Sequence, residues 1–192
     1  MNNIIIARFN EELNWVNNVT EKYNFFVYDK GDKSDCHHVS YLENVGRESN
    51  TFLHYIVTNY NNLGEYNVFL QGNPFRETPN IVNILNNLKE SESSVVSIST
   101  IFSCDINGAP HHNGLPLTEF CDLFQIKKHQ KFNFMVGQQF YLHKSIILKK
   151  PLSYYANLLD YTKTREISPW VFERMWFYVF SDEGEYLEYN II

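Results

Sequence analysis

The chain has 192 residues, of which 44% are hydrophobic and 16% aromatic, and its formal net charge is -6 at pH 7. This length and apolar content predict a single folded domain over residues 1–192 and exclude a disordered chain. The acidic balance argues against a nucleic-acid partner, which needs a basic face. No apolar run approaches the roughly 20 residues that span a bilayer, so no transmembrane segment is expected.

Cysteine usage and the N-terminus indicate the compartment. Three widely spaced cysteines, Cys36, Cys104 and Cys121, are an odd number and fit reduced thiols better than a disulfide framework. The first residues lack the charged start, long apolar core and cleavage site of a signal peptide. We therefore expect a cytoplasmic protein, whose oligomeric state the sequence leaves open.

The first half of the chain alternates apolar runs with helical patterns. Residues 4–7, 25–28 and 66–70 are expected to form buried strands. Leu13, Val16 and Val19 suggest a short helix after the first strand, and residues 29–33 a turn after the second. A longer helix is expected to open at 46–48. Its apolar positions recur at helical spacing: Phe52, Leu53, Ile56, Tyr60 and Leu63.

The second half continues the alternation. Thr78-Pro79 predicts a helix start, because a capping hydroxyl precedes a proline at the first helical position. Further strands are expected at 95–102 and 132–142, with a surface loop at 103–116 and two closing helices at 152–161 and 169–180. Short buried strands separated by helices predict an α/β fold, a three-layer sandwich with a mainly parallel central sheet.

Polar clusters follow three of the expected strands: 8–11, 29–31 and 71–74. In open parallel sheets, ligands bind at the carboxyl ends of the strands, so these clusters are expected to converge on a binding site. An ordinary turn is the alternative for 71–74. The candidate substrate-binding residues in the three clusters are Arg8, Asn10, Asp29, Lys30, Gln71, Gly72 and Asn73.

The segment Asn44–Glu48 is the most informative stretch of the chain. A helix N-terminus offers unpaired N–H groups, Gly46 permits close approach of a ligand, and Arg47 adds a planar fork suited to phosphate or carboxylate. The segment therefore suggests an anion site that includes Asn44, Gly46, Arg47 and Glu48. The alternative is an Arg–Glu pair that only joins a loop to a helix.

Glu173 is the candidate catalytic acid or base. It shares one helix face with four aromatic residues at positions 170, 176, 177 and 180. Partial desolvation there would raise the pKa of its carboxyl group toward the range useful for proton transfer. The alternative is a buried structural glutamate paired with an arginine from elsewhere in the chain, for example Arg47 or Arg8.

Other polar groups give weaker indications. Gly137 interrupts a strand-like run, which suggests a bulge or an approach of Gln138 and Gln139 to a ligand. His112 could contact a substrate phosphate or hydroxyl. Two groups, Cys36-His37-His38 and the pair His111-His112 with Cys104 and Asp105 upstream, lack the ligand spacing of a zinc module, so we assign no metal ligand.

Taken in order, these segments resemble a known family. The residues at 6–11, 27–31 and 44–48, followed by Val-Phe-Leu-Gln-Gly at 68–72 and the helix around 172–176, resemble an uncharacterised family of fungi and bacteria. Its signature is Asn-Val-Gly-Arg-Glu before a helix, and the resemblance covers residues 4 to about 180. That family is similar to glycosyltransferases of the GT-A type that act in capsule and lipopolysaccharide synthesis.

The resemblance implies transfer of a sugar from a nucleotide-activated donor to a saccharide or other hydroxyl acceptor, in surface polysaccharide synthesis. Arg8 and Asp29 would face the nucleotide, Arg47 the diphosphate, and Glu173 would deprotonate the acceptor. GT-A enzymes usually carry Asp-x-Asp after a central strand to hold Mn²⁺ or Mg²⁺, and this chain has Gln71-Gly72-Asn73 there. A metal is possible, and so is a metal-free clamp of Arg47 and lysines.

Two alternatives remain open. The missing Asp-x-Asp motif would also fit a non-catalytic module that binds a nucleotide or carbohydrate. The second alternative is a hydrolase of glycosidic or phosphoester bonds with two carboxylates, Glu173 and either Glu48 or Asp105.

Overall fold

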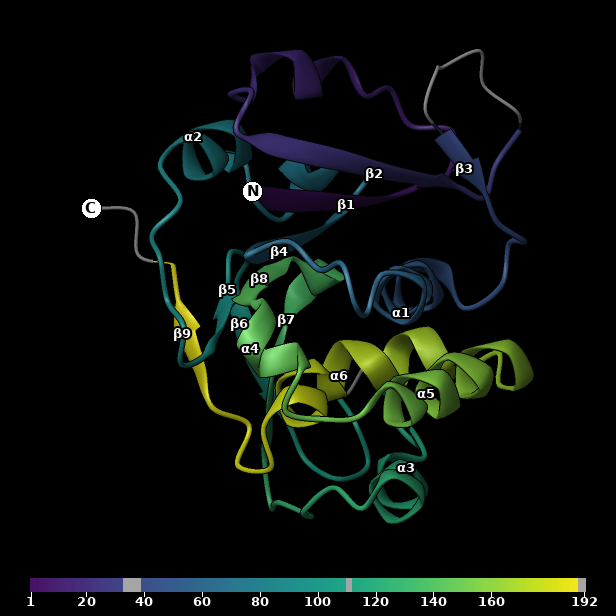
Figure 1. The fold of residues 1–192 in the computed structure, drawn as a ribbon. Helices are drawn as coiled ribbons and strands as arrows, with labels where there is room; N and C mark the ends of the chain where they lie inside the picture. The colour runs from purple at the N-terminus through teal and green to yellow at the C-terminus, as the bar shows by residue number, and fades with distance from the viewer. Residues whose placement is uncertain (33–38, 110–111, 190–192) are drawn as a thin grey trace.

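The computed structural model describes residues 1–32, 39–109 and 112–189. In this part of the chain seven strands form one sheet in the order β3-β2-β1-β4-β8-β5-β9, and β6 and β7 pair in a second, two-stranded sheet (Figure 1). The strands of the large sheet are β1 (Asn2–Arg8), β2 (Tyr23–Asp29), β3 (Val39–Tyr41), β4 (Tyr66–Gln71), β5 (Val95–Ser97), β8 (Phe140–His143) and β9 (Tyr186–Glu188). The small sheet contains β6 (Ile101–Cys104) and β7 (Phe132–Met135).

The large sheet is mainly parallel. β1 pairs in parallel with both β2 and β4, β2 with β3, and β5 with β9, whereas β8 runs antiparallel between β4 and β5. The carboxyl ends of β1, β2 and β4 therefore lie at one edge of the sheet. This confirms the predicted mixed α/β class with a mainly parallel sheet.

Helices lie on both faces of the sheet, as Figure 1 shows for α1, α5 and α6 on one side and α2 on the other. The α-helices are α1 (Arg47–Thr58), α2 (Ile81–Asn86), α3 (Leu117–Phe124), α4 (Lys144–Ile147), α5 (Leu152–Thr164) and α6 (Ser168–Phe180). The short 3-10 helices are η1 (Asn14–Asn18), η2 (Pro74–Arg76) and η4 (Val136–Gln138). Within the described residues, no helix has the length and apolar character needed to cross a membrane.

Two buried clusters result from the alternation of side chains along the strands. Ile5 of β1 faces the larger cluster, with α1, α5 and α6, whereas Ile4 and Ile6 face the smaller one, with η1 and α2. The larger cluster is rich in aromatic rings, among which Phe52 of α1 lies 6.1 Å from Trp176 of α6 between ring centroids. The sheet edge that carries the polar clusters is thus supported by a core on each face.

Three strand predictions hold and two do not. The strands expected at 4–7, 25–28 and 66–70 are present as β1, β2 and β4. The runs at 95–102 and 132–142, each expected to be one strand, divide into β5 and β6 and into β7 and β8. The runs divide because β6, from the end of the first run, pairs with β7, from the start of the second, and these two strands form the small sheet. The apolar pattern alone does not predict that each run is split between two sheets.

The helix boundaries also differ from expectation. The helix expected from Thr78 begins at Ile81 instead, because the Thr78 hydroxyl donates to the carbonyl of Ile98 at 2.9 Å and does not cap a helix. The short helix at 13–19 is the 3-10 helix η1, and α1 ends at Thr58, before Tyr60 and Leu63. α3 was not expected, whereas α5 and α6 match the two predicted closing helices.

Candidate functional site

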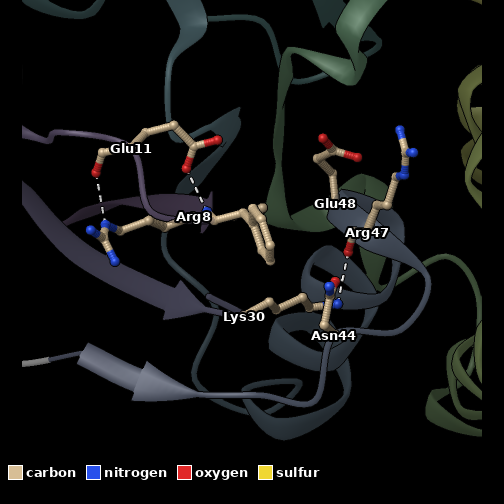
Figure 2. A pocket seen from close by; sticks show the side chains of 8 residues that line it. Arg8, Glu11, Lys30, Asn44, Arg47 and Glu48 are labelled. Carbon is tan, nitrogen blue, oxygen red and sulfur yellow. Dashed lines mark hydrogen bonds between the residues drawn. The ribbon is translucent and has the colours of Figure 1, made fainter. Parts of the chain in front are cut away.

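A cavity of about 320 Å³ opens at the carboxyl edge of β1 and β2, beside the start of α1. Figure 2 places Arg8 and Glu11 on one side of it and Arg47 and Glu48 on the other. The residues that line it come from three separate segments of the chain: Ala7, Arg8, Phe9, Glu11, Lys30, Asn44, Arg47 and Glu48.

Parallel pairing brings the three predicted polar clusters together. Arg8 is in register with Asp29 of β2, and Ala7 with Gln71 of β4. Just beyond the strands, the amide of Lys30 donates to the carbonyl of Arg8 at 3.0 Å. The amide of Gly72 likewise donates to the carbonyl of Ala7 at 2.8 Å. The expectation that the clusters converge at one edge is therefore confirmed.

Arg8 and Asp29 neutralise each other instead of facing the cavity with free charges. The Arg8 guanidinium forms an ion pair with the fully buried Asp29 carboxylate and donates from Nε to the carbonyl of Glu11 at 2.8 Å. The second Asp29 oxygen accepts from the amide of Gly31 at 2.9 Å. Asn10, whose φ is 68°, accepts from the amide of Asp32 and shapes the adjoining turn.

Lys30 borders the cavity, but its ammonium points into the protein. It donates to the carbonyls of Val45 at 2.5 Å and Arg47 at 2.8 Å, and to Oδ1 of Asn50 at 2.9 Å. Burial lowers the pKa of Lys30 to about 7, and the nearby Glu48 carboxylate opposes that shift. This lysine is therefore occupied by the segment that leads into α1.

Arg47 is the exposed cation of the cavity. It is the first residue of α1 and follows Gly46, and φ is 59° at Gly46 and 45° at Arg47. The N-cap residue is Gly46, which has no side chain to cap the N-terminus of the helix. The Arg47 guanidinium lies over the ring of Trp170 in α6, with Cζ 4.9 Å from the ring centroid.

Glu48 is the half-buried carboxylate of the cavity wall. Nε2 of Gln71 donates to it at 3.2 Å, which places the end of β4 beside the start of α1. Burial raises the pKa of the Glu48 carboxyl group, Glu173 adds to the rise, and Arg47 and Lys30 oppose it. A raised pKa makes this carboxylate a stronger proton acceptor than an exposed glutamate.

Glu173 does not line this cavity. It accepts from the amide of Gly137 at 3.0 Å and forms an ion pair with its neighbour Arg174, whose side chain is fully buried. Glu173 thus has the arginine partner of the structural alternative, and that partner is Arg174, not Arg47 or Arg8. The aromatic face of α6 is buried at Trp176 but only partly buried at Glu173.

The two predicted glutamines lie in the interior. Oε1 of Gln138 accepts from the Ser49 hydroxyl at 2.7 Å and from Nε1 of Trp176 at 2.8 Å. Nε2 of Gln139 donates to the carbonyl of Pro74 at 3.1 Å. Gly137 does not form the predicted bulge but a 3-10 turn, η4, where its φ is 71°.

The turn after β4 contacts residues next to the cavity and makes ordinary structural hydrogen bonds. The carbonyl of Gly72 accepts from Nε1 of Trp15 at 3.0 Å, and an added Cβ at Gly72 would meet the Glu11 carboxylate at 2.5 Å. The Asn73 side chain accepts from the amide of Phe75 at the start of η2. These contacts are those of an ordinary structural turn, the alternative that the sequence left open.

The histidine and cysteine groups lie away from the cavity or outside the described residues. The centroid of the His112 ring lies 5.2 Å from that of Trp170, the ring on which Arg47 packs. Nδ1 of His112 also lies 3.4 Å from Nη2 of Arg174. Cys104 and Asp105 line a separate cavity, and burial raises the pKa of the Cys104 thiol to about 11. Cys36-His37-His38 and His111 are not among the described residues. Within residues 1–32, 39–109 and 112–189, no three His, Cys, Asp or Glu side chains gather closely enough to hold a metal ion.

Several residues at the site were missed in the sequence, among them Glu11, Phe9 and Trp170. Phe9 lines the cavity and is 53% exposed, although aromatic side chains are usually buried. Its position inside the polar run at 8–11 is the signal that could have identified it. Trp170 reaches Arg47 only through the packing of α6 on α1, and no local pattern reports that contact.

Comparison with known proteins finds one similarity. Residues 4–97, just under half of the chain, match the family described as "Protein of unknown function (DUF3431)". The match spans β1 to β5 and so contains all of the residues that line the cavity. No curated protein and no solved structure matches the chain.

Proposed function

We propose that the chain is a glycosyltransferase of the GT-A type, which moves a sugar from a nucleotide-activated donor to a hydroxyl group of an acceptor. The observation that carries the proposal is the cavity at the carboxyl edge of β1 and β2, which has the exposed Arg47 and the uncapped start of α1 on its wall. Ligands of open α/β sheets bind at this edge, and a helix N-terminus favours a diphosphate.

The topology of the sheet supports the proposal. Counted along the chain, its strands lie in the order 3-2-1-4-6-5-7, and the sixth, β8, is antiparallel to its neighbours. A mainly parallel sheet of this kind, with helices on both faces (Figure 1), is compatible with the α/β fold that the resemblance implies. The likeness concerns the fold, so the assignment of the reaction depends on the side chains of the cavity.

The donor would be bound mainly by Arg47. Its guanidinium is exposed, and within the described residues no carboxylate lies at ion-pair distance from it. A guanidinium fork and the first N–H groups of α1 would hold the diphosphate and stabilise the charge that grows on it as the sugar leaves. The exposed ring of Phe9 offers an apolar face for the base of the nucleotide.

Glu48 would act as the base toward the acceptor hydroxyl. It lines the cavity, and its raised pKa makes the carboxylate a stronger proton acceptor. Glu173, which the sequence favoured for this role, is paired with Arg174 outside the cavity lining. The geometry therefore favours Glu48 over Glu173 as the catalytic residue.

The donor atoms after β4 do not fit the usual metal clamp. Gln71 and Asn73 provide amides where an Asp-x-Asp motif would provide carboxylates, and hard cations prefer carboxylate oxygens. We therefore derive no step through Mn²⁺ or Mg²⁺ and assign the charge clamp to Arg47 and α1. The same two amides favour the alternative function, a module that binds a nucleotide sugar without transferring it.

Calorimetric titration with a panel of nucleotides and nucleotide sugars, with and without Mn²⁺, tests the proposal. We expect micromolar affinity for at least one nucleotide sugar, reduced about 10- to 100-fold in Arg47→Ala, because a charge-assisted hydrogen bond is lost. The matched control is Arg165→Ala, which removes an exposed arginine that pairs with Glu119 at 2.9 Å elsewhere.

The outcomes separate the candidate functions. Binding together with transfer to a saccharide acceptor supports the transferase, and binding without any turnover supports the binding module. Failure of every nucleotide and nucleotide sugar to bind, with and without metal, would overturn both.

A further inference from the structure

Lys30 is fully engaged inside the protein although it borders the cavity. Its ammonium carries three N–H donors, and three oxygens accept from it at 2.5, 2.8 and 2.9 Å. Only 8% of the residue is exposed. No donor is left over for a ligand, so Lys30 has a different role from the substrate contact that the sequence suggested.

The three oxygens belong to the turn that leads into α1. Two are the carbonyls of Val45 and Arg47, on either side of Gly46, and the third is the side chain of Asn50 one turn further along the helix. Asn50 in addition donates to the Thr162 hydroxyl at 2.8 Å, which connects this turn to α5. One buried cation thus joins the end of β2, the turn and a helix on the face of the sheet.

The turn has an unfavourable backbone conformation. Gly46 and Arg47 are consecutive residues with positive φ, of 59° and 45°, and this region is costly for a residue that carries a Cβ atom. Such a conformation persists only where surrounding contacts hold it. The Lys30 ammonium binds the carbonyls on both sides of Gly46 and so holds the turn from within the protein.

We propose that Lys30 is a positioning residue, whose ammonium holds the left-handed turn at Gly46 and Arg47 and so sets the place of the Arg47 guanidinium at the cavity. Lys30 acts on the ligand through Arg47 and makes no contact with it. The inference rests on the proposed function only for the nature of the ligand that Arg47 meets.

The first test needs no ligand. Hydrogen–deuterium exchange of Lys30→Met should be about tenfold faster than that of the wild type in peptides covering residues 44–50, and unchanged in α2 and β8. Lys30→Arg should restore part of the protection, because it keeps a buried cation. The control is Lys22→Met, which removes an exposed lysine that donates to the carbonyl of Asn86 at 3.2 Å.

Unchanged exchange at residues 44–50 in Lys30→Met, or an equal rise across the whole chain, would overturn the proposal. If Lys30→Met does not fold, Asn50→Ala removes one of the three acceptors in a milder way. It should produce the same local rise.

The second test is a double-mutant cycle with UDP-glucose as the probe. Lys30→Met should weaken binding about tenfold in the wild type and less than twofold in Arg47→Ala, because its effect passes through Arg47. An equal loss in both backgrounds would mean that Lys30 acts independently and would overturn the proposal. If UDP-glucose does not bind to the wild type, that result counts against the proposed function, and the exchange measurement alone decides the role of Lys30.

Discussion

The guanidinium of Arg47 lies on the indole ring of Trp170, with Cζ 4.9 Å from the ring centroid. Arg47 is the first residue of α1 and Trp170 lies in the first turn of α6, so the contact joins the starts of two helices beside the cavity. A cation–π contact orients the guanidinium without an ion pair, in contrast to Arg8, which is paired with Asp29. Arg47 is thus ordered in place and still able to meet an anion.

We expect Trp170→Ala to weaken the binding of a nucleotide sugar about three- to tenfold, because Arg47 loses the surface that orients it. Trp170→Phe keeps an aromatic face and should retain most of the affinity. Isothermal titration calorimetry measures both. Wild-type affinity in Trp170→Ala would show that this contact does not contribute to binding.

Glu48→Gln should lower the turnover of a sugar transfer reaction at least 100-fold while donor affinity changes less than threefold, since the loss of a general base costs about 10²- to 10⁴-fold. Glu173→Gln is the matched variant and should keep more than a tenth of the wild-type rate. Steady-state kinetics with both proteins decides between the two carboxylates. The reverse pattern, with activity lost only in Glu173→Gln, would return the catalytic role to Glu173.

The buried ammonium of Lys30 makes stability depend on pH. Because burial lowers its pKa in the folded protein to about 7, the unfolded chain binds this proton more tightly between pH 7 and the ordinary lysine pKa of about 10.4. The free energy of unfolding of the wild type should therefore rise with pH in this window, relative to Lys30→Met. The rise should be on the order of 1 kcal/mol per pH unit.

Urea denaturation of both proteins at several pH values measures this difference. Glu48 and His54 are the titratable neighbours that share this region. Both are retained in the variant, so the difference between the two proteins isolates Lys30. A difference that stays constant from pH 7 to pH 9 would contradict the lowered pKa.

Gly46→Ala should destabilise the protein by about 2–4 kcal/mol. Its φ is 59°, and the added Cβ would lie 2.8 Å from that of Asn50 and 2.9 Å from that of Thr162. Gly114→Ala is the matched control, because its φ of 80° is also positive but nothing lies within 4 Å of the added Cβ. It should cost only about 1 kcal/mol, and chemical denaturation compares the two. Equal losses would mean that backbone strain, and not the close packing of α1 on α5, sets the requirement for glycine.

Gln138→Ala should lower stability by about 1–3 kcal/mol without changing nucleotide-sugar affinity. The substitution leaves the Ser49 hydroxyl and the Trp176 indole N–H without the acceptor they share in the interior. Thermal unfolding and calorimetry test the two halves of this prediction. A loss of affinity at unchanged stability would place Gln138 in the binding site after all.

The sequence by itself determined those strands and helices whose apolar pattern can be recognised within one short segment. Apolar runs such as Ile4–Ile6 and Val68–Leu70 favour burial, and the parallel sheet they predict brings the polar residues that follow them to one edge. The helix patterns at 152–164 and 168–180 were predicted almost to their ends, because apolar residues recur in them at helical spacing. The place of the candidate site was therefore predictable, and so was the presence of Arg47 and Glu48 in it.

Tertiary structure alone decided how the residues at this edge are used. The run at 95–102 and the run at 132–142 each divide between two sheets because their halves have different pairing partners. Arg8 is neutralised by Asp29, Lys30 is turned inward by the carbonyls of Val45 and Arg47, and Arg47 is held outward by Trp170. Each of these roles depends on a partner from another segment of the chain. Composition and spacing reveal which charges a chain carries, but only the packing of strands and helices decides which of them remain free to meet a ligand.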